Sequence, residues 1–514
     1  KDIKFSSPAW LPDESGFFYT RFVDHANDEL IEITEGSQVW FHKLGTHQSN
    51  DQFVYTDKSD PSFYYGPKVT KDGGWLVITA NKGTDSNNGI LIKGPNEDNI
   101  RWLDDAFDAE LTLIGGIENT LWFKTNRNAP RGKIVCIDLT NPKPIWRDVV
   151  DERSEILKSA DVVGGKIAVT WLKDAATKAT VHNLDGKELY AVAMPGAGTA
   201  GGFSGDNKDT TVYWSFSSFN QPPSIYTLDI DTQNTEKIWQ ATVPIDLSNI
   251  DVKQVFVEST DGARVPLFIT HRKDVKLDGN NPVLLYGYGG FDIPILPRFS
   301  ASRAVWVSMG GIYVNACIRG GSEYGKNWHE SGMLKNKQQV FDDFISCAEW
   351  LIDKKWTTPQ KLGIQGGSNG GLLVGACMTQ RPDLFGACLP AVGVMDMLRF
   401  HLFTVGWAWT SEYGSPDDAN FFPYLLKYSP LHNIRPNICY PPTLITTGDT
   451  DDRVVPGHSF KFAAQLQFSQ ACKNPTLIRI ETRAGHGSGK PTSLRIEETA
   501  DIYAFLYKYL GIKK

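Results

Sequence analysis

With 514 residues the chain is too long for one ordinary domain, and we expect two or three. Proportions of 41% hydrophobic and 22% charged residues are typical of soluble globular proteins, and no apolar run approaches the roughly 18–20 residues of a membrane span. The net charge of -7, without a Lys/Arg run, argues against nucleic acid as a main partner.

Residues 1–245 contain short segments rich in β-branched and aromatic residues, each introduced by Gly, Asp or Asn. The predicted strands include GFFYTRF, GGWLVITANKG, NTLWFKTN, GKIAVTWLKD and TVYWSFSSF. Their turn signals recur about every 40–57 residues, close to the roughly 40–50 residues of a four-stranded propeller blade. The pattern favours a β-propeller domain. A pair of β-sandwiches is the alternative, because exact repeats such as Trp-Asp dipeptides are absent.

Residues 246–514 follow a different pattern, in which short apolar runs alternate with amphipathic helical segments. The runs include PVLLYGYGG, GGIYVNACIRGG, KLGIQGG, ACLPAVG, PPTLITTGD and PTLIRIETRAG. Helices are predicted in NKQQVFDDFISCAEWLIDK and SLRIEETADIYAFLYKYL. This alternation predicts a mostly parallel sheet covered by helices on both faces, with its chemistry at the carboxyl ends of the strands.

One serine stands in the pattern G-x-S-x-G, formed by residues 366–370. The strand LGIQ precedes it, and GLLVGACMTQ opens a helix that ends at Arg381 and Pro382. This context predicts a nucleophile elbow, in which Ser368 adopts a strained conformation and glycines two residues to either side avoid collisions. The alternative is a glycine-rich turn that binds phosphate or has no chemical role.

A serine hydroxyl needs a base, and in this architecture the acid and then the histidine follow the serine. Among the downstream histidines, His432 precedes the best acids, and His458 begins an amphipathic helix, where capping or packing is expected. His486 lies in the loop RAGHGSGKP after the strand TLIRIET, so we predict that it is the base.

Three acids follow the preceding predicted strand, TLITT. One carboxylate is enough to orient the histidine, and spacing alone does not choose among Asp449, Asp451 and Asp452. The oxyanion should be held by the backbone N–H of Asn369 and by a second donor from LLYGYGGF, where a glycine amide or a tyrosine hydroxyl could serve.

The seven cysteines are odd in number, scattered and without a CxxC pair. They are Cys136, Cys317, Cys347, Cys377, Cys388, Cys439 and Cys472. The pattern predicts buried free thiols in a reducing compartment, without a disulfide or zinc framework. We therefore expect a cytoplasmic location. The N-terminus KDIKFSSPAW has neither an initiator Met nor a signal-peptide core.

Several motifs occur in an order that resembles the prolyl oligopeptidase (prolyl endopeptidase) family of serine peptidases. They are YGYGGF, RGGSEYG, GGSNGG, VGVMDM, AWTSEYG, KYSPLHN, DDRVVPGHS and AGHGSGKP. The similarity is specific after about residue 245 and weaker before it, for example in FKTNRNAP. It implies a β-propeller over 1–245 followed by an α/β-hydrolase peptidase domain over 246–514.

The resemblance also implies roles for individual residues. Ser368 would be the nucleophile, Asp451 the acid and His486 the base, with the Tyr288 hydroxyl and the Asn369 amide as oxyanion donors. The residues implied to bind substrate are Arg453 for a carbonyl, Trp409 for stacking on proline, and Phe291, Val394, Tyr413 and Val454 for lining the proline slot. A flat apolar slot suits a pyrrolidine ring.

The implied activity is hydrolysis of short peptides on the carboxyl side of proline, through an acyl-enzyme and without metal or cofactor. Peptide macrocyclisation by the same triad is an alternative, and so is a catalytically silent propeller scaffold that binds proteins. We expect a monomer whose partner is a proline-containing oligopeptide, with neither membrane nor nucleic acid involved. About five blades fit where the family has seven, so we expect that an N-terminal segment of the same polypeptide is missing.

Overall fold

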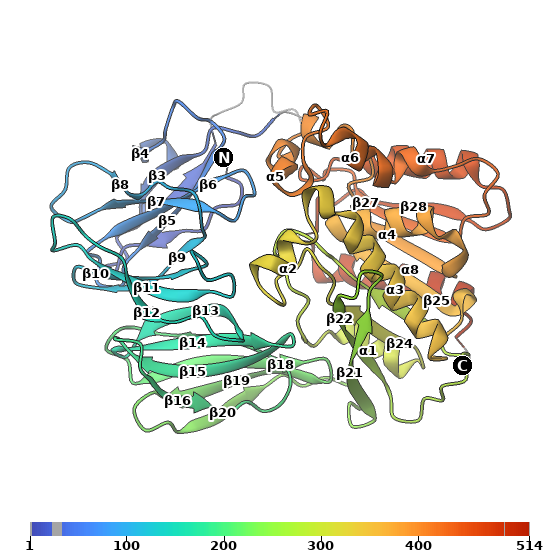
Figure 1. The fold of residues 1–514 in the computed structure, drawn as a ribbon, viewed down its shortest axis with the longest axis horizontal. Coiled ribbons are helices and arrows are strands. Elements are labelled where there is room, and N and C mark those ends of the chain that lie inside the picture. The colour runs from blue at the N-terminus through green and yellow to red at the C-terminus, as the bar shows by residue number, and fades with distance from the viewer. Residues whose placement is uncertain (1–2, 23–32, 488, 513–514) are drawn as a thin grey trace.

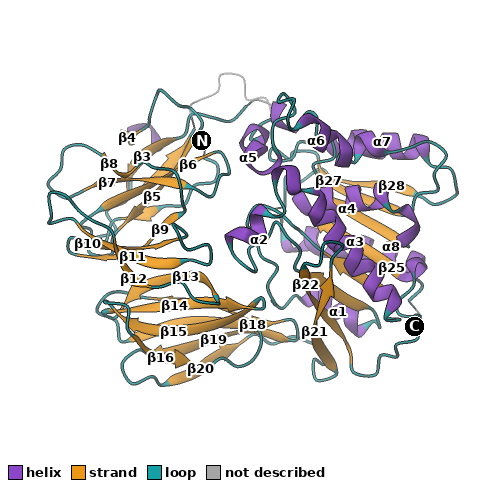
Figure 2. Ribbon diagram, viewed as in Figure 1, coloured by secondary structure: helices purple, strands orange, loops and turns teal. Residues whose placement is uncertain are grey.

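The computed structural model describes residues 3–22, 33–487 and 489–512, which form two parts that lie side by side (Figure 1). The first part consists mainly of strands and loops, with a short 3₁₀ helix at Gln48–Asn50, and the second is a sheet covered by helices (Figure 2). In these residues no helix is long and apolar enough to cross a membrane.

The first part contains five antiparallel sheets, each built from four consecutive strands. The first two sheets consist of β1 (Ala9–Trp10), β2 (Gly16–Arg21), β3 (Gln38–Lys43) and β4 (Gln52–Tyr55), and of β5 (Phe63–Val69), β6 (Leu76–Lys82), β7 (Asn88–Lys93) and β8 (Arg101–Asp104). The third consists of β9 (Leu111–Ile117), β10 (Thr120–Thr125), β11 (Lys133–Asp138) and β12 (Arg147–Val150). The last two consist of β13 (Ile156–Val163), β14 (Lys166–Lys173), β15 (Ala176–Asn183) and β16 (Glu188–Val192), and of β17 (Thr199–Ser204), β18 (Thr211–Ser218), β19 (Gln221–Asp229) and β20 (Thr235–Gln240).

Side chains that alternate between two apolar layers hold neighbouring sheets together. In β6, Leu76 and Ile78 pack in the layer against the first sheet, whereas Val77 packs in the layer shared with the third sheet. A strand buried on both faces must be apolar at consecutive positions, which explains the run LVI. The five strand segments predicted in this part coincide with β2, β6, β10, β14 and β18, the second strand of each sheet. The arrangement is that of propeller blades, so the sandwich alternative is wrong.

The second part is built on an eight-stranded sheet of order β21-β22-β24-β23-β25-β26-β27-β28. Its strands are β21 (Ile250–Glu258), β22 (Arg264–Arg272), β23 (Val283–Tyr286), β24 (Ile312–Ala316), β25 (Leu362–Gly367), β26 (Ala387–Ala391), β27 (Thr443–Gly448) and β28 (Thr476–Glu481). The strands from β24 to β28 pair in parallel, and β21 and β22 add an antiparallel edge. Its helices are α1 (Ala301–Ser308), α2 (Lys326–Glu330), α3 (Gln338–Asp353), α4 (Asn369–Gln380), α5 (Thr410–Tyr413), α6 (Phe422–Tyr428), α7 (Gly457–Ser469) and α8 (Thr492–Leu510).

Both faces of this sheet are buried, as the continuous apolar strands predicted. In β23, Val283 and Leu285 face the layer that contains α3 and α4, whereas Leu284 faces the layer that contains α1 and α8. The predicted helices over 336–354 and 493–510 correspond to α3 and α8. The carboxyl ends of the parallel strands therefore lie at one edge of the sheet, where the predicted functional residues follow.

The two parts touch through backbone hydrogen bonds. The Thr84 N–H donates to the Ala408 carbonyl at 3.1 Å, and the Lys326 N–H at the start of α2 donates to the Pro130 carbonyl at 3.0 Å. In Figure 1, α2 lies on the side of the second part that faces the first-part sheets. The boundary near residue 245 stays a prediction.

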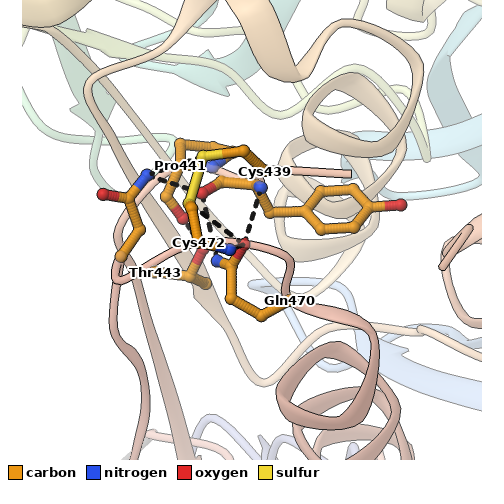
Figure 3. The surroundings of a disulfide bond; sticks show 7 residues. Cys439, Pro441, Thr443, Gln470 and Cys472 are labelled. Carbon is orange, nitrogen blue, oxygen red and sulfur yellow. Dashed lines mark hydrogen bonds between the residues drawn. A yellow bond between two sulfur atoms is a disulfide. The ribbon is translucent and has the colours of Figure 1, made fainter. Parts of the chain in front are cut away.

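A disulfide joins Cys439 and Cys472, so the expectation of free thiols at every cysteine is wrong for this pair (Figure 3). The two cysteines are 33 residues apart, but a parallel β-bridge between Ile438 and Gln470 lays their segments side by side. Their Cα atoms are 5.1 Å apart, within the range that a disulfide spans. Sequence spacing could not reveal this long-range contact. The other five cysteines are buried and free.

Candidate active site

The turn between β25 and α4 places Ser368 at the carboxyl end of a central strand. Its backbone has φ 58° and ψ -120°, a strained conformation for a residue with a side chain. A Cβ on Gly366 would lie 2.3 Å from the Gly370 carbonyl oxygen, and one on Gly370 would lie 2.8 Å from the Gly287 oxygen. The glycines two residues to either side of the serine are thus required by close backbone contacts, as the elbow pattern predicted.

Ser368 opens into a cavity of about 330 Å³ at this edge of the sheet. Seven of the predicted site residues line it: Ser368, Tyr288, Phe291, Val394, Trp409, Tyr413 and Arg453. The first part of the chain supplies Phe5, Tyr64, Gly83 and Thr84 to the same wall. Residues far apart in the sequence therefore share one mostly apolar space, at the lower end of the size range of small-molecule sites.

The side chains of Asp451 and His486 form a hydrogen-bonded pair. The carboxylate oxygen Oδ2 lies 2.7 Å from the imidazole Nδ1. The other oxygen, Oδ1, accepts the N–H groups of Arg453 at 3.0 Å and Val454 at 2.9 Å. Since Asp451 is buried and these bonds fix its orientation, it can hold the imidazole with Nε2 directed away from the carboxylate.

The loop after β28 can approach the end of β27 closely because that strand ends in a glycine, Gly448, and this approach brings His486 to Asp451. A Cβ on Gly448 would lie 2.3 Å from the Ala484 carbonyl oxygen. In the described part of the chain His486 is hydrogen-bonded to Asp451, and no hydrogen bond joins it to Ser368. The structure thus unites the predicted acid and base, and it places the predicted nucleophile in the cavity described above.

The predicted oxyanion donors lie on two neighbouring strand ends. Tyr288 follows β23 and lines the cavity with Ser368. Burial raises the pKa of Tyr288 to about 12, and interaction with the Ser368 hydroxyl partly offsets this rise. The N–H of Asn369 belongs to the first turn of α4, where the helix itself offers no acceptor. Its side chain donates to the Tyr288 carbonyl at 2.6 Å, which ties the two strand ends together.

Aromatic rings enclose the remaining side of the cavity. Phe291 meets Tyr413 edge to face at 5.5 Å between ring centroids, and Phe400 stacks on Trp409 at 6.3 Å. Phe291 has φ 57°, so a strained backbone directs its side chain into this position. Val454 does not line the cavity. It packs in the buried cluster that also contains Trp409.

Asp452, His432 and His458, which competed for the roles of acid and base, have other partners. Asp452 forms an ion pair with Lys4 at 2.8 Å. The His432 Nδ1 lies 2.8 Å from the Ser429 hydroxyl. His458 is buried in α7, where its Nδ1 accepts the Asp396 N–H at 3.1 Å, in agreement with the packing role expected for it.

Sequence reasoning missed a buried charged cluster behind the cavity, formed by Glu412, Lys337 and His329. Glu412 stands inside AWTSEYG, between two residues already assigned to the proline slot, so a charge in an apolar segment was the available signal. The contribution of the first part, such as Thr84 and Tyr64, was also missed, because no local pattern marks a contact between domains.

A β-propeller joined to an α/β-hydrolase sheet that carries a serine elbow and a His–Asp pair defines the class of propeller-bearing serine hydrolases. Comparisons with known proteins agree. Residues 297–513 match the model described as "Prolyl oligopeptidase family", and residues 1–241 match "Prolyl oligopeptidase, N-terminal beta-propeller domain". The chain belongs to the prolyl oligopeptidase family.

Similar proteins cover the full length of the chain. A prolyl endopeptidase of Elizabethkingia miricola is 42% identical over 100% of this chain and 73% of its own length. A dual function macrocyclase-peptidase of Galerina marginata is 34% identical over 100% of this chain and 72% of its own length. A solved structure from a study of two prolyl endopeptidases superposes with a TM-score of 0.96 at 39% identity, covering 100% of this chain and 76% of that one. The predicted fold class, family and serine peptidase activity are thereby confirmed.

Proposed function

We propose that the chain hydrolyses short peptides on the carboxyl side of proline, with Ser368 as the nucleophile. One observation carries the proposal: Ser368 and the aromatic face of Trp409 line the same small cavity. A pyrrolidine ring stacked on that face would leave its carbonyl carbon near the serine hydroxyl. The guanidinium of Arg453, which also lines the cavity, would bind the carbonyl of a preceding residue.

In the first half of the reaction, Ser368 Oγ attacks the prolyl carbonyl while His486 Nε2 accepts the hydroxyl proton. This step requires the imidazole to come into hydrogen-bond contact with the serine when peptide binds, and such contacts often tighten only in the substrate complex. The negative charge that forms on the carbonyl oxygen is held by the Tyr288 hydroxyl and the Asn369 N–H. His486 then gives its proton to the leaving amine, the C–N bond breaks, and an ester on Ser368 remains.

In the second half, water takes the place of the leaving amine. His486 accepts a proton from the water, whose oxygen attacks the ester carbonyl, and Asp451 stabilises the imidazolium. Collapse of the tetrahedral intermediate returns the proton to Ser368 and releases a peptide that ends in proline. The reaction consumes one water and needs no other reactant.

The test is Ser368→Ala, compared with the parent and with Ser154→Ala on the exposed surface. Cleavage of a Gly-Pro reporter peptide should be lost in Ser368→Ala and retained in the control. A fluorophosphonate probe should label the parent but not Ser368→Ala. Cleavage that persists in purified Ser368→Ala would reject the assignment, and a parent that resists labelling would favour the silent scaffold.

Peptide macrocyclisation is a second candidate, because two relatives are named dual function macrocyclase-peptidases and share about a third of their residues with this chain. The same acyl-enzyme would then be attacked by the substrate's own amino terminus. Mass spectrometry separates the outcomes, since a cyclic product is 18 Da lighter than the hydrolysed one, by the mass of one water. A long peptide with an internal proline should yield linear products if hydrolysis is the activity.

We further propose that the chain acts as a cytoplasmic monomer. Five buried free cysteines support a reducing compartment, whereas the Cys439–Cys472 disulfide is the kind of bond that oxidising compartments favour. Fractionation of the cells, with thiols alkylated immediately upon lysis, tests the location. Light scattering of the purified protein tests the monomer. Recovery outside the cytoplasm, or a dimer mass, would refute the respective statement.

A further inference from the structure

A buried carboxylate lies directly behind the wall of the cavity. Glu412 sits in the short helix α5, between Trp409 and Tyr413, and only 3% of its surface is exposed. Neither the proposed nucleophilic attack nor the proton transfers use it. Because burying a charge is costly unless it is paired, its partners show what it holds in place.

Both carboxylate oxygens of Glu412 are paired with cations from other elements. His329 Nε2 of α2 lies 2.8 Å from Oε2, and Lys337 Nζ, just before α3, lies 3.3 Å from Oε1. Burial alone would raise the pKa of Glu412, but the charges of Lys337 and His329 lower it overall. Burial lowers the pKa of His329, but the hydrogen bond and negative charge of Glu412, together with the charge of Asp292, raise it overall. The cluster therefore carries charge in the interior.

Lys337 links this cluster to the loop that bears the predicted oxyanion tyrosine. Its Nζ donates to the Gly289 carbonyl at 2.8 Å and lies 5.3 Å from the centre of the Tyr413 ring. The Tyr413 hydroxyl in turn donates to Asn369 Oδ1 at 2.9 Å. Together with the bond from Asn369 to the Tyr288 carbonyl, these contacts join three segments. They are the proline wall (residues 406–413), the oxyanion loop (residues 287–292) and the serine elbow.

The cluster also extends toward the first part of the chain. His329 is on α2, whose first N–H donates to the carbonyl of Pro130 in the loop between β10 and β11 of the third sheet. It lines a second, small polar cavity between the two parts, which also contains Lys124, Lys158 and Asp292. The position of α2 against the propeller is thus connected to the proline wall through one ion pair.

We propose that Glu412, held by Lys337 and His329, is a positioning residue that fixes the spacing between the proline-binding wall and the oxyanion loop, and so sets the preference for proline. This rests on the proposed function. A buried ion pair seldom contributes much net stability, because desolvation offsets the attraction. Its directional bonds instead fix the relative placement of two segments, residues 287–292 and 406–413, that no shared sheet or helix joins.

The experiment compares Glu412→Gln with the parent and with Glu349→Gln, which removes a carboxylate paired on the surface with Arg381 at 2.6 Å. Active serines are counted with a fluorophosphonate, and kcat and KM are measured for matched reporters with proline or alanine before the cleaved bond. In Glu412→Gln the proline-to-alanine ratio of kcat/KM should fall about tenfold or more, chiefly through a higher KM for proline. Glu349→Gln should keep the parental ratio.

A second pair of variants guards against misfolding of Glu412→Gln. His329→Gln keeps an N–H donor for Glu412, and His329→Leu removes it. The ratio should stay near the parent in His329→Gln and fall in His329→Leu. The proposal would be overturned if the proline-to-alanine ratio of kcat/KM stayed within twofold of the parent in Glu412→Gln and His329→Leu while their melting temperatures dropped. Glu412 would then support folding only. A parent without labelling or proline cleavage would instead refute the proposed function.

Discussion

At the scale of single residues, the cavity brings Ser368 together with Tyr288, one of the two proposed oxyanion donors, and with the aromatic wall. Tyr288 and Asn369 follow adjacent strands, and the Asn369 side chain binds the Tyr288 backbone, so these two proposed donors are held in a fixed relation. A preorganised pair of donors stabilises developing charge without reorganisation during the reaction.

Tyr288→Phe should therefore slow turnover while binding is retained. Loss of one oxyanion donor costs about 10²–10³ in kcat, with little change in KM because the hydroxyl binds the charge that forms only during attack. Tyr286→Phe is a matched control, since this neighbouring ring stacks near Tyr313, away from the cavity lining. Steady-state kinetics with a Gly-Pro reporter would contradict the role if both variants kept the parental kcat.

The sequence predicted the individual residues of this site better than it predicted which of them contact one another. The elbow motif and strand order pointed to Ser368 and His486, because each lies just after an apolar strand. Asp451 could not be separated from its neighbours by spacing, since the distinction depends on which carboxylate meets the imidazole at 2.7 Å. Glu412 was passed over because its two cations come from segments about 75 and 83 residues away along the chain.

At the scale of elements, the strand–turn–helix of β25 and α4 depends on close backbone approach. Gly366 lies against the carbonyl of Gly370 and Gly370 lies against that of Gly287, whereas a Cβ on Gly367 would make only ordinary van der Waals contact with Ala391. In the sequence motif, Gly366 and Gly370 are therefore sterically required, whereas Gly367 tolerates a side chain.

Gly366→Ala should destabilise the fold, and Gly367→Ala should not. The new methyl at position 366 would meet the Gly370 oxygen at 2.3 Å, whereas at position 367 the nearest atom is 3.8 Å away. Overpacking of this kind typically costs about 1–3 kcal/mol. Thermal unfolding of the two variants in parallel is the measurement, and equal melting temperatures would show that the elbow relaxes without cost.

Long elements were predictable and short ones were not. Continuous apolar strands and the periodic helices α3 and α8 carry patterns long enough to read from sequence. In contrast, α2 and α5 have five and four residues, too few for a hydrophobic period, although they hold His329 and Glu412. Their conformation follows from tertiary contacts, so the cluster they form was invisible before the structure.

At the scale of the whole molecule, the second part carries a covalent link that its sequence did not suggest. The Cys439–Cys472 bond ties the segment before β27 to the end of α7, and Gln470 adds a hydrogen bond from its Nε2 to the Tyr440 carbonyl at 3.1 Å (Figure 3). It thereby braces the strand that leads to Asp451.

The double variant Cys439→Ser/Cys472→Ser should lower stability by about 2–4 kcal/mol, since the bond closes a loop of 33 residues in the unfolded chain. Urea unfolding of the parent, with and without reductant, is the measurement, and reductant should leave the variant unchanged. Alkylation of the denatured, unreduced parent should modify five of its seven cysteines. Modification of all seven would contradict the disulfide.

The placement of one part against the other was beyond sequence analysis, because contacts such as Thr84 to Ala408 join residues with no common motif. Yet these contacts complete the wall in which Ser368 lies. Any compound that fills this space must touch both parts at once. An inhibitor that fills the cavity would consequently hold the two parts together. The inhibitor-bound protein should therefore resist proteolysis between the two parts, even at cleavage sites that the inhibitor does not touch.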